Sequence, residues 1–285
     1  IDSLKQNNVK IIDKYNLENL KTLASTGSPL IHESFHYVYN NIKKNIHLTS
    51  ISGGTDIVSC FVLGNPNLPI YAGEIQCKGL GMDVAIFNEA GKEINNKKGE
   101  LVCKSSFPSK PLFFWNDKNN VKFQKAYFNK YKNIWHHSDY AEKTNNNGYI
   151  IYGRSDATLN SGGIRIGTAE IYRVVENIKN ISECIAVEQK YNNDTRILLF
   201  VKLNKNIKLD EKLIKKIKDK IKINLSPKHI PNKIIKVFDI PRTKSGKIVE
   251  LTIKKIVNNE KINNLNSIAN PECLEEFRKK SQIIN

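Results

Sequence analysis

The sequence GYIIYGRSDATLNSGGIRIGTAEI at residues 148–171 is the densest run of structural signals in the chain. It reads as a strand that runs into a Gly-Arg-Ser-Asp turn, then a Gly-Gly turn, and finally the start of a helix. Glycines let a backbone approach a ligand closely, and Arg154 and Arg165 can each bind a phosphate or a ribose through a forked guanidinium group. Taken alone, the stretch is explained equally well by a hairpin with two surface arginines, because turn-rich loops are common.

The residues that follow predict a small α+β domain. Residues 168–178 have the spacing of an amphipathic helix, with Thr168 as its expected N-cap and Glu170 in its first turn. Further elements are expected as two strands within 183–203 that join at 192–194, a lysine-rich helix with a solvated face at 210–224, a strand at 233–238 and a helix at 248–257.

The residues that precede it predict the end of a larger, β-rich domain. Helices are expected at 1–23, 31–44 and 117–131, a turn-rich loop at 24–30, a strand at 46–52, and short strands between Gly/Asn turns over 57–104. The domain boundary is expected near Gly153, which gives one unit at 1–153 and a second at 154–285.

Two shorter motifs lie on either side of this stretch. The first is Ser52-Gly53-Gly54-Thr55-Asp56, where a hydroxyl beside a carboxylate suits a phosphate oxygen and its Mg²⁺. The second is PRTKSGK at 241–247, which reads as an exposed basic loop. Each also has a plainer interpretation, the first as an ordinary turn and the second as one more lysine cluster in a lysine-rich chain.

Together and in this order, the motifs resemble those of the AMP-forming acyl-CoA synthetases of the adenylate-forming ligase superfamily. The matching segments are SGGTD (52–56), GEL (99–101), HSD (137–139), GRSD (153–156), GGIRIGTAEI (162–171) and SGK (245–247). Six ordered motifs cover nearly the whole chain. The resemblance implies that 1–153 is the C-terminal part of a large AMP-binding domain and 154–285 a small mobile α+β domain, an α/β and α+β architecture.

Within that superfamily the chain resembles acetoacetate–CoA ligases. The form SDATLNSGGIRIGTAEIY, the small Gly53, and a tail from Asn270 to Phe277 carry this narrower likeness. It implies adenylation of acetoacetate by ATP with Mg²⁺, then thioester formation with coenzyme A and release of AMP and PPi. A ligase for another short acid, acetate or propionate, is the nearest alternative, and an inactive piece is another.

The resemblance also implies a role for individual residues. The adenine site would be lined by Gly27, Ser28 and Pro29, and the ATP phosphates and Mg²⁺ would be met by Gly53, Gly54, Thr55 and Asp56. Asp139 would bind the ribose hydroxyls, Arg154 would support the ribose, and Arg165 the phosphates. Asp156 would be the hinge, Ser161 and Gly162 would contact coenzyme A, Gly53 would shape the acyl pocket, and Lys247 would be catalytic together with Thr55. Asp56 replaces the Glu of the family pattern and is one methylene shorter.

The formal charge of +17 raises the alternative of a nucleic-acid-binding protein. Lysine outnumbers arginine 39 to 6, however, whereas phosphate and base recognition favours arginine and interleaved aromatics. The basic excess is +5 in 1–153 and +12 in 154–285. We therefore expect no nucleic-acid partner, and a basic second half that helps a polyanionic substrate such as coenzyme A to dock.

The five cysteines form no C-x-x-C pair and no zinc pattern, which indicates reduced, cytoplasmic thiols without a catalytic role. No apolar run approaches the ~18 residues that a bilayer span needs, so no membrane partner is expected. The first residue is Ile, and the Ser/Thr/Gly-rich phosphate loop of the superfamily does not occur in the sequence. We expect the N-terminal part of the same enzyme to supply that loop, and the chain alone to be inactive.

Overall fold

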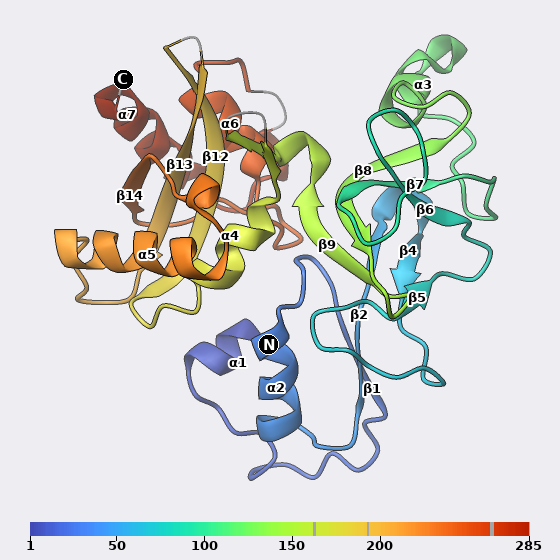
Figure 1. Cartoon of the computed structure of the whole chain (residues 1–285), viewed down its shortest axis with the longest axis horizontal. Coiled ribbons are helices and arrows are strands. Elements are labelled where there is room, and N and C mark those ends of the chain that lie inside the picture. The colour runs from blue at the N-terminus through green and yellow to red at the C-terminus, as the bar shows by residue number, and fades with distance from the viewer. Residues whose placement is uncertain (162–163, 193, 263–264, 285) are drawn as a thin grey trace. The chain divides into compact units, whose positions relative to one another are not determined.

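The structure is a computed structural model that describes residues 1–161, 164–192, 194–262 and 265–284. The chain divides into two compact units, residues 1–152 and 153–285 (Figure 1). No helix among the described residues is long and apolar enough to cross a membrane.

The N-terminal part of the first unit holds a two-stranded parallel sheet beside two helices. Its elements are α1 (Asp2–Gln6), β1 (Thr22–Ser25), α2 (His32–Asn41) and β2 (His47–Ser50). Strands β1 and β2 pair in parallel, with Thr22 opposite His47 and Ser25 opposite Ser50. A core cluster that includes Phe35, Val38 and Leu48 lies beneath them.

The prediction of a helix over 1–23 is wrong: α1 ends at Gln6, and strand β1 begins at Thr22. The intervening segment satisfies its backbone groups in other ways. Lys43 Nζ donates to the carbonyls of Leu17 at 2.6 Å and Leu20 at 2.7 Å, and Asn16 Oδ1 accepts from a backbone amide two residues on. Asparagine favours such local bonds over helix, while the apolar side chains of the segment pack on the same cluster as α2.

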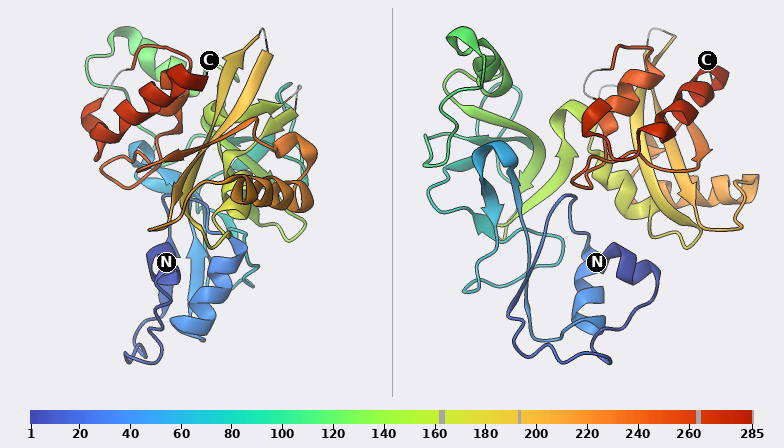
Figure 2. Two further views of the ribbon diagram at one scale, coloured as in Figure 1. Left: turned by 90° about the vertical axis from the view of Figure 1, so that its left-hand side faces the viewer. Right: turned by 180° about the vertical axis from the view of Figure 1, so that it is seen from behind.

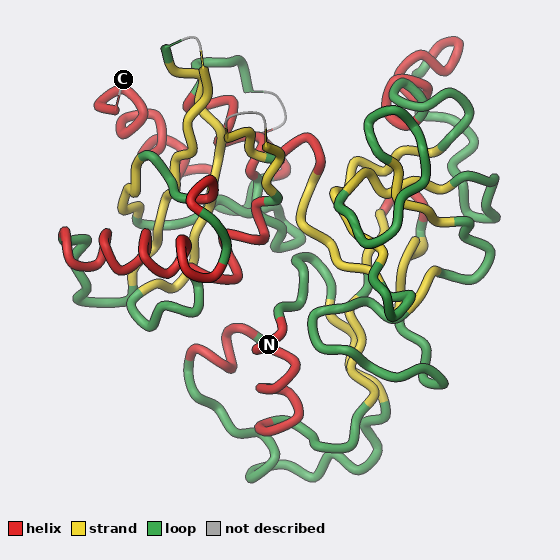
Figure 3. Tube along the Cα trace, in the orientation of Figure 1, coloured by secondary structure: helices red, strands yellow, loops and turns green. Residues whose placement is uncertain are grey.

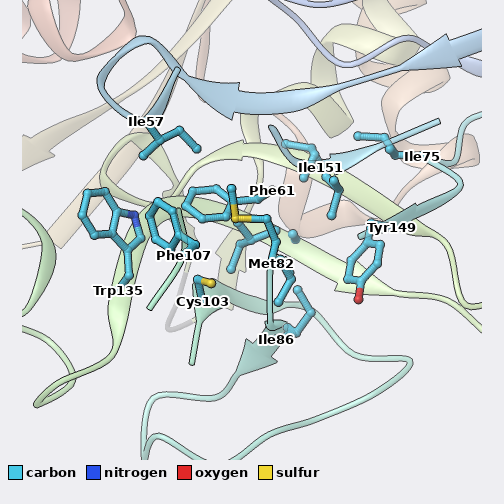
Figure 4. Close-up of a cluster of buried hydrophobic side chains, with 14 of the residues drawn as sticks. Ile57, Phe61, Ile75, Met82, Ile86, Cys103, Phe107, Trp135, Tyr149 and Ile151 are labelled. Carbon is cyan, nitrogen blue, oxygen red and sulfur yellow. The ribbon is translucent and has the colours of Figure 1, made fainter. Parts of the chain in front are cut away.

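Two further sheets with antiparallel strand pairing form most of the rest of the first unit, and Figure 3 draws their strands in yellow. One contains β3 (Ser52–Gly54), β4 (Ser59–Leu63) and β5 (Cys77–Lys78); the other contains β6 (Val84–Phe87), β7 (Gly99–Cys103), β8 (Trp135–Lys143) and β9 (Tyr149–Arg154). Their shared core contains Phe61, Phe107 and Trp135, which lie together at one end of the cluster in Figure 4. The helix expected at 117–131 is shorter: a 3₁₀ turn precedes α3 (Val121–Tyr127).

The second unit is a three-stranded sheet with helices on both faces (Figure 2). Its elements are β10 (Leu159–Ser161), β11 (Ile164–Ile166), α4 (Thr168–Val175), β12 (Ile181–Tyr191), β13 (Asp194–Leu203), α5 (Glu211–Asn224), β14 (Lys233–Val237), α6 (Glu250–Val257) and α7 (Leu274–Ile284). Along β12, Cys184 and Ala186 pack against α4 and α5, whereas Ile185 and Val187 pack against α6 and α7. Side chains of a strand alternate between its faces, so two apolar faces require a near-continuous apolar strand.

Most elements expected in this unit are confirmed, with two differences. The N-cap of α4 is Gly167 and not Thr168; the Gly167 amide donates to Glu170 Oε1 at 2.9 Å, which satisfies one amide at the helix start. The tail carries a helix, α7, that no expectation included, and its Phe277 is buried in the core.

Candidate functional site

Two segments expected to bind nucleotide follow the carboxyl ends of β1 and β2. Gly27, Ser28 and Pro29 come after β1, and the 52–56 motif comes after β2. Because these strands are parallel neighbours, their ends meet at one edge, and the Ile51 amide donates to the Ser25 carbonyl at 3.0 Å. Crevices outside the carboxyl ends of parallel strands are common ligand sites. The strand β1 that creates this geometry was not expected.

Gly53 has a backbone reason to be glycine. It lies in β3 opposite Cys60 of β4, and a Cβ added there would stand 2.1 Å from the Ser59 carbonyl oxygen and 2.7 Å from Cys60 Cα. Neither atom belongs to a side chain that could rotate away. The closeness of β3 to β4 thus excludes any side chain at this position without a shift of the strands. Its role in an acyl pocket stays a prediction.

Thr55 and Asp56 begin a 3₁₀ helix, η1 (Thr55–Ile57), and both are exposed. The Asp56 carboxylate accepts a hydrogen bond from the hydroxyl of Tyr127 in α3. The Tyr127 ring in turn stacks on Trp135, with ring centroids 3.7 Å apart and planes 14° from parallel. An aromatic stack anchored in the core of the unit therefore fixes the direction of the Asp56 carboxylate.

Asp139 lies on a bulge of β8. Glu100 pairs with Tyr140 and Val102 pairs with His136, so three residues of β8 stand opposite one of β7. Ser138, inside the bulge, has a φ of 61°. Bulges re-aim side chains, and here the buried Asp139 carboxylate accepts from the Ser52 hydroxyl at 3.3 Å. The bulge brings Asp139, the candidate ribose ligand, to the start of the candidate phosphate motif.

His137 fixes the same motif through the backbone. Trp135 Nε1 donates to His137 Nδ1 at 3.3 Å, so that nitrogen is the acceptor. His137 Nε2 then carries the hydrogen and donates to the Gly53 carbonyl at 3.3 Å. Phe61 packs edge-on against the imidazole, with centroids 4.7 Å apart. The chain from Trp135 to Gly53 thus holds β3 in place beneath the candidate phosphate site.

Glu100 of the GEL motif is fully buried beneath this bulge. Its two oxygens bind Lys130 Nζ at 2.5 Å and His136 Nε2 at 2.9 Å. A buried carboxylate is stable only when it is paired and hydrogen-bonded. The motif therefore has a structural role here, tying the segment after α3 to β8.

In the second unit, the Gly-Arg-Ser-Asp turn packs on the start of α4. Gly153 has a φ of 117°, which suits only glycine. Arg154 and Asp156 pair through their side chains at 3.4 Å, and both are exposed. Arg165 of β11 reaches back, and its Nη2 donates to the Ser155 carbonyl at 3.3 Å. The structure thus gathers the two candidate nucleotide-binding arginines at one turn.

Ser161, one of the two coenzyme A candidates, lies in the β10–β11 hairpin. Ser161 ends β10 and pairs with Ile164 of β11. Gly162 lies outside the described residues.

Lys247 is presented by a small hairpin. Two hydrogen bonds join Thr243 and Lys247: the Thr243 amide donates to the Lys247 carbonyl at 2.8 Å, and the Lys247 amide donates to the Thr243 side-chain oxygen Oγ1 at 3.0 Å. Gly246, at a φ of 84°, makes the turn. The Lys247 side chain is exposed, and within the described part of the chain no residue forms a hydrogen bond or ion pair with its ammonium group. The hairpin therefore fixes the backbone and leaves the ammonium group available.

The tail holds this hairpin from behind. Asn270 Oδ1 accepts from the Arg242 amide at 2.9 Å, and its Nδ2 donates to Asp239 Oδ2 at 2.7 Å. An open depression of about 370 Å³ is lined mainly by charged and polar residues of the hairpin, of the segment before it, of the tail, and of strands β12 and β13. The tail therefore stabilises the backbone at the base of the hairpin that carries Lys247.

No role in the site had been expected for Tyr127, Trp135 or His137. The pattern Trp135-x-His137-x-Asp139 could have indicated that three polar or aromatic side chains share one strand face. Nothing local pointed to Tyr127, which lies 71 residues from Asp56. Among the described residues, no group of three His, Cys, Asp or Glu side chains could hold a metal ion. Asp56 is an exposed carboxylate, and Mg²⁺ in proteins is commonly held by one or two carboxylates together with substrate phosphates.

Comparison with known proteins finds relatives that match nearly the whole chain. The chain is 49% identical over 277 residues to acetoacetyl-coenzyme A synthetase of Rhizobium meliloti (strain 1021), covering 97% of this chain and 43% of that protein. It is 42% identical over 285 residues to acetoacetyl-CoA synthetase of Gallus gallus, covering 99% of this chain and 43% of that protein. No family model matches the chain. The chain thus spans less than half the length of these relatives.

A solved structure of a protein with the same name as these relatives also matches the chain. The acetoacetyl-CoA synthetase from Streptomyces lividans matches with a TM-score of 0.90 and 33% identity, over 99% of this chain and 44% of that one. The anthranilate CoA ligase AuaEII in complex with anthranoyl-AMP matches with a TM-score of 0.75 at 19% identity, over 89% of this chain and 48% of that one, which speaks for the fold alone.

Proposed function

We propose that this chain, which belongs to the AMP-forming acyl-CoA synthetases, works as the C-terminal part of an acetoacetate–CoA ligase. The observation that carries the proposal is the likeness, over nearly the whole chain, to acetoacetyl-CoA synthetases of a bacterium and of animals. The gathering of the motif residues within each unit supports it. The activity belongs to the whole protein, of which this chain is less than half by the length of its relatives.

In the first half-reaction, a carboxylate oxygen of acetoacetate attacks the α-phosphorus of ATP, and pyrophosphate leaves. The Thr55 hydroxyl would bind the α-phosphate, and Asp56, held by Tyr127, would face the Mg²⁺ that accompanies the phosphates. Asp139 would accept from the ribose hydroxyls. Gly27, Ser28 and Pro29 would lie against the adenine.

Lys247 would act in the same step. An ammonium group placed between the substrate carboxylate and the α-phosphate stabilises the charge that builds there in the transition state. The exposed side chain on a backbone-fixed hairpin supports this role. Arg154 and Arg165 would support the ribose and the phosphates.

In the second half-reaction, the thiol of coenzyme A attacks the acyl carbon of acetoacetyl-AMP, loses its proton, and AMP leaves. We propose that residues 153–285 turn about Asp156 between the two steps, as gating domains do in other enzymes. Ser161 and the segment after it would then meet coenzyme A.

The five free thiols fit a reducing, cytoplasmic setting.

The test is an acid panel on the full-length parent. Acetoacetate should give the highest kcat/KM for CoA- and ATP-dependent AMP release, above acetate, propionate and butyrate. Preference for acetate or propionate would replace the proposal by the nearest alternative. The 285-residue chain alone should release no pyrophosphate, because the superfamily's phosphate loop does not occur in its sequence.

A further inference from the structure

Glu250 begins α6 with its carboxylate directed into the second unit. Its Oε1 accepts two hydrogen bonds, from Thr168 Oγ1 at 2.8 Å and from the Tyr172 hydroxyl at 3.0 Å. Both donors lie on α4. A single carboxylate oxygen therefore joins the first turn of α6 to the first turns of α4.

The direction of the Tyr172 bond is fixed by the sheet. The Ala186 amide of β12 donates to the Tyr172 oxygen at 3.2 Å. The tyrosine hydrogen is then directed at Glu250, and burial raises the pKa of Tyr172 well above its ordinary value, so the hydrogen is retained. The bonds run in one sense from β12 through α4 to α6.

The same network touches the Gly-Arg-Ser-Asp turn. A Cβ added to Gly153 would lie 2.8 Å from Thr168 Oγ1, the atom that donates to Glu250. Helix α6 also packs beside the Ser155–Ala157 turn. Burial raises the pKa of Glu250; Asp156 raises it further and Arg154 lowers it, so the carboxylate is electrostatically coupled to both residues of the turn.

Lys247 stands three residues before Glu250, and the Lys247 hairpin leads directly into α6. Resting on the proposed function, we infer that Glu250 is a positioning residue: it couples the hairpin that presents Lys247 to the hinge turn at 153–157. Hydrogen bonds from Thr168 and Tyr172 of α4 hold Oε1 of Glu250 in place. They therefore set the direction in which α6 and the hairpin before it leave the core. A displacement of about 1 Å at a reacting group can cost about 100-fold in rate.

The test uses the full-length parent and measures the two half-reactions separately. Glu250→Ala and Tyr172→Phe should lower kcat for acetoacetate-dependent ATP–PPi exchange about 10- to 100-fold, with KM for ATP nearly unchanged, because Lys247 acts in the transition state. Conversion of supplied acetoacetyl-AMP and coenzyme A should change less than about threefold. Glu250→Gln keeps an oxygen acceptor for both donors and should restore most of the exchange activity.

The matched control is Glu260→Gln, an exposed carboxylate that binds Lys190 at 3.1 Å, which should behave as wild type. Equal loss of both half-reactions in Glu250→Ala and Tyr172→Phe would show a merely structural role and overturn the inference. Wild-type activity in both variants would overturn it as well.

Amide hydrogen exchange gives a reading that needs no substrate. Residues 242–248 and 155–158 should exchange faster in Glu250→Ala and Tyr172→Phe than in wild type or Glu260→Gln. Unchanged exchange in both segments would refute the coupling. If the wild-type parent shows no ATP–PPi exchange with acetoacetate, the proposed function is wrong. Amide hydrogen exchange then still tests whether Glu250 couples the hairpin to the turn.

Discussion

Ser52 and Asp139, which stand 87 residues apart in the chain, meet through a hydrogen bond of 3.3 Å from the serine hydroxyl to carboxylate oxygen Oδ2. Ser52 opens the candidate phosphate motif, and Asp139 is the candidate ribose ligand. One bond thus sets the spacing between the places where ribose and α-phosphate would lie, since a β8 bulge on one side and a β3–β4 pair on the other hold its ends.

Asp139→Asn in the full-length parent should weaken ATP binding. Asparagine keeps the shape but loses a charged acceptor, and hydrogen bonds to charged groups contribute about 1.5–3 kcal/mol, so KM for ATP should rise about 10- to 100-fold. Comparison with 3′-deoxy-ATP locates the effect: wild type should discriminate between the two nucleotides and the variant should not. An Asn variant that still prefers ATP to the same degree would place the ribose elsewhere.

Lys247→Ala should separate the two half-reactions. ATP–PPi exchange driven by acetoacetate should fall below detection, because the charge on the α-phosphate loses its partner. Supplied acetoacetyl-AMP and coenzyme A should still give product. Lys244→Ala changes an exposed lysine of the same hairpin and serves as the control, with both rates near wild type. Parallel loss of both half-reactions in Lys247→Ala would contradict the assigned role.

Asp156→Pro should uncouple the half-reactions instead of removing one. Proline fixes φ near −65°, so a hinge residue replaced by proline cannot adopt two conformations. Overall turnover should fall by at least about 100-fold while at least one isolated half-reaction persists. Asp156→Ala keeps the backbone free and should retain turnover. Near-normal turnover in the proline variant would move the hinge to another residue.

Gly53→Ala should damage activity with every acid. The added Cβ would meet backbone atoms of β4 at 2.1 and 2.7 Å, and β3 can relieve the overlap only by moving away. We therefore expect kcat/KM for acetoacetate and for acetate to fall by the same factor. If Gly53 instead shapes the acyl pocket, Gly53→Ala should be tolerated, and Gly53→Trp should lower activity with acetoacetate more than activity with acetate. Measuring both acids with both variants decides between backbone and pocket.

The thiols should be slow to react at neutral pH. Burial raises the pKa of Cys273 to about 11, and the pKa values of Cys60, Cys77, Cys103 and Cys184 lie above their ordinary value for the same reason. The thiolate is the reactive form, and a raised pKa moves its formation to higher pH. Iodoacetamide labelling of the native chain should therefore keep accelerating between pH 8 and 10. A plateau below pH 8 would reveal a low-pKa cysteine and contradict this picture.

In the second unit the sequence was enough to predict the sheet strands and helices α4, α5 and α6, but not α7. Apolar residues occupy consecutive positions in Ile185–Ala186–Val187 and Leu198–Leu199–Phe200, which is what a strand covered on both faces requires, and the helix face of Leu213, Ile217 and Ile221 follows a 3.6-residue period. Such patterns are local, so they can be read without knowing what packs against them. The motif order, which depends only on residue type and spacing, determined the family.

The contacts between distant segments could be found only in the folded structure. The segment between Gln6 and Thr22 is not helical, and Lys43, more than 20 residues away, donates to the carbonyls of Leu17 and Leu20. Asp56 is held by Tyr127, Asp139 by Ser52, and Glu250 by Thr168 and Tyr172. Each of these partners lies dozens of residues from its carboxylate. Propensity and periodicity act over one or two turns, whereas hydrogen bonds between distant side chains exist only once strands have found their register and helices their faces.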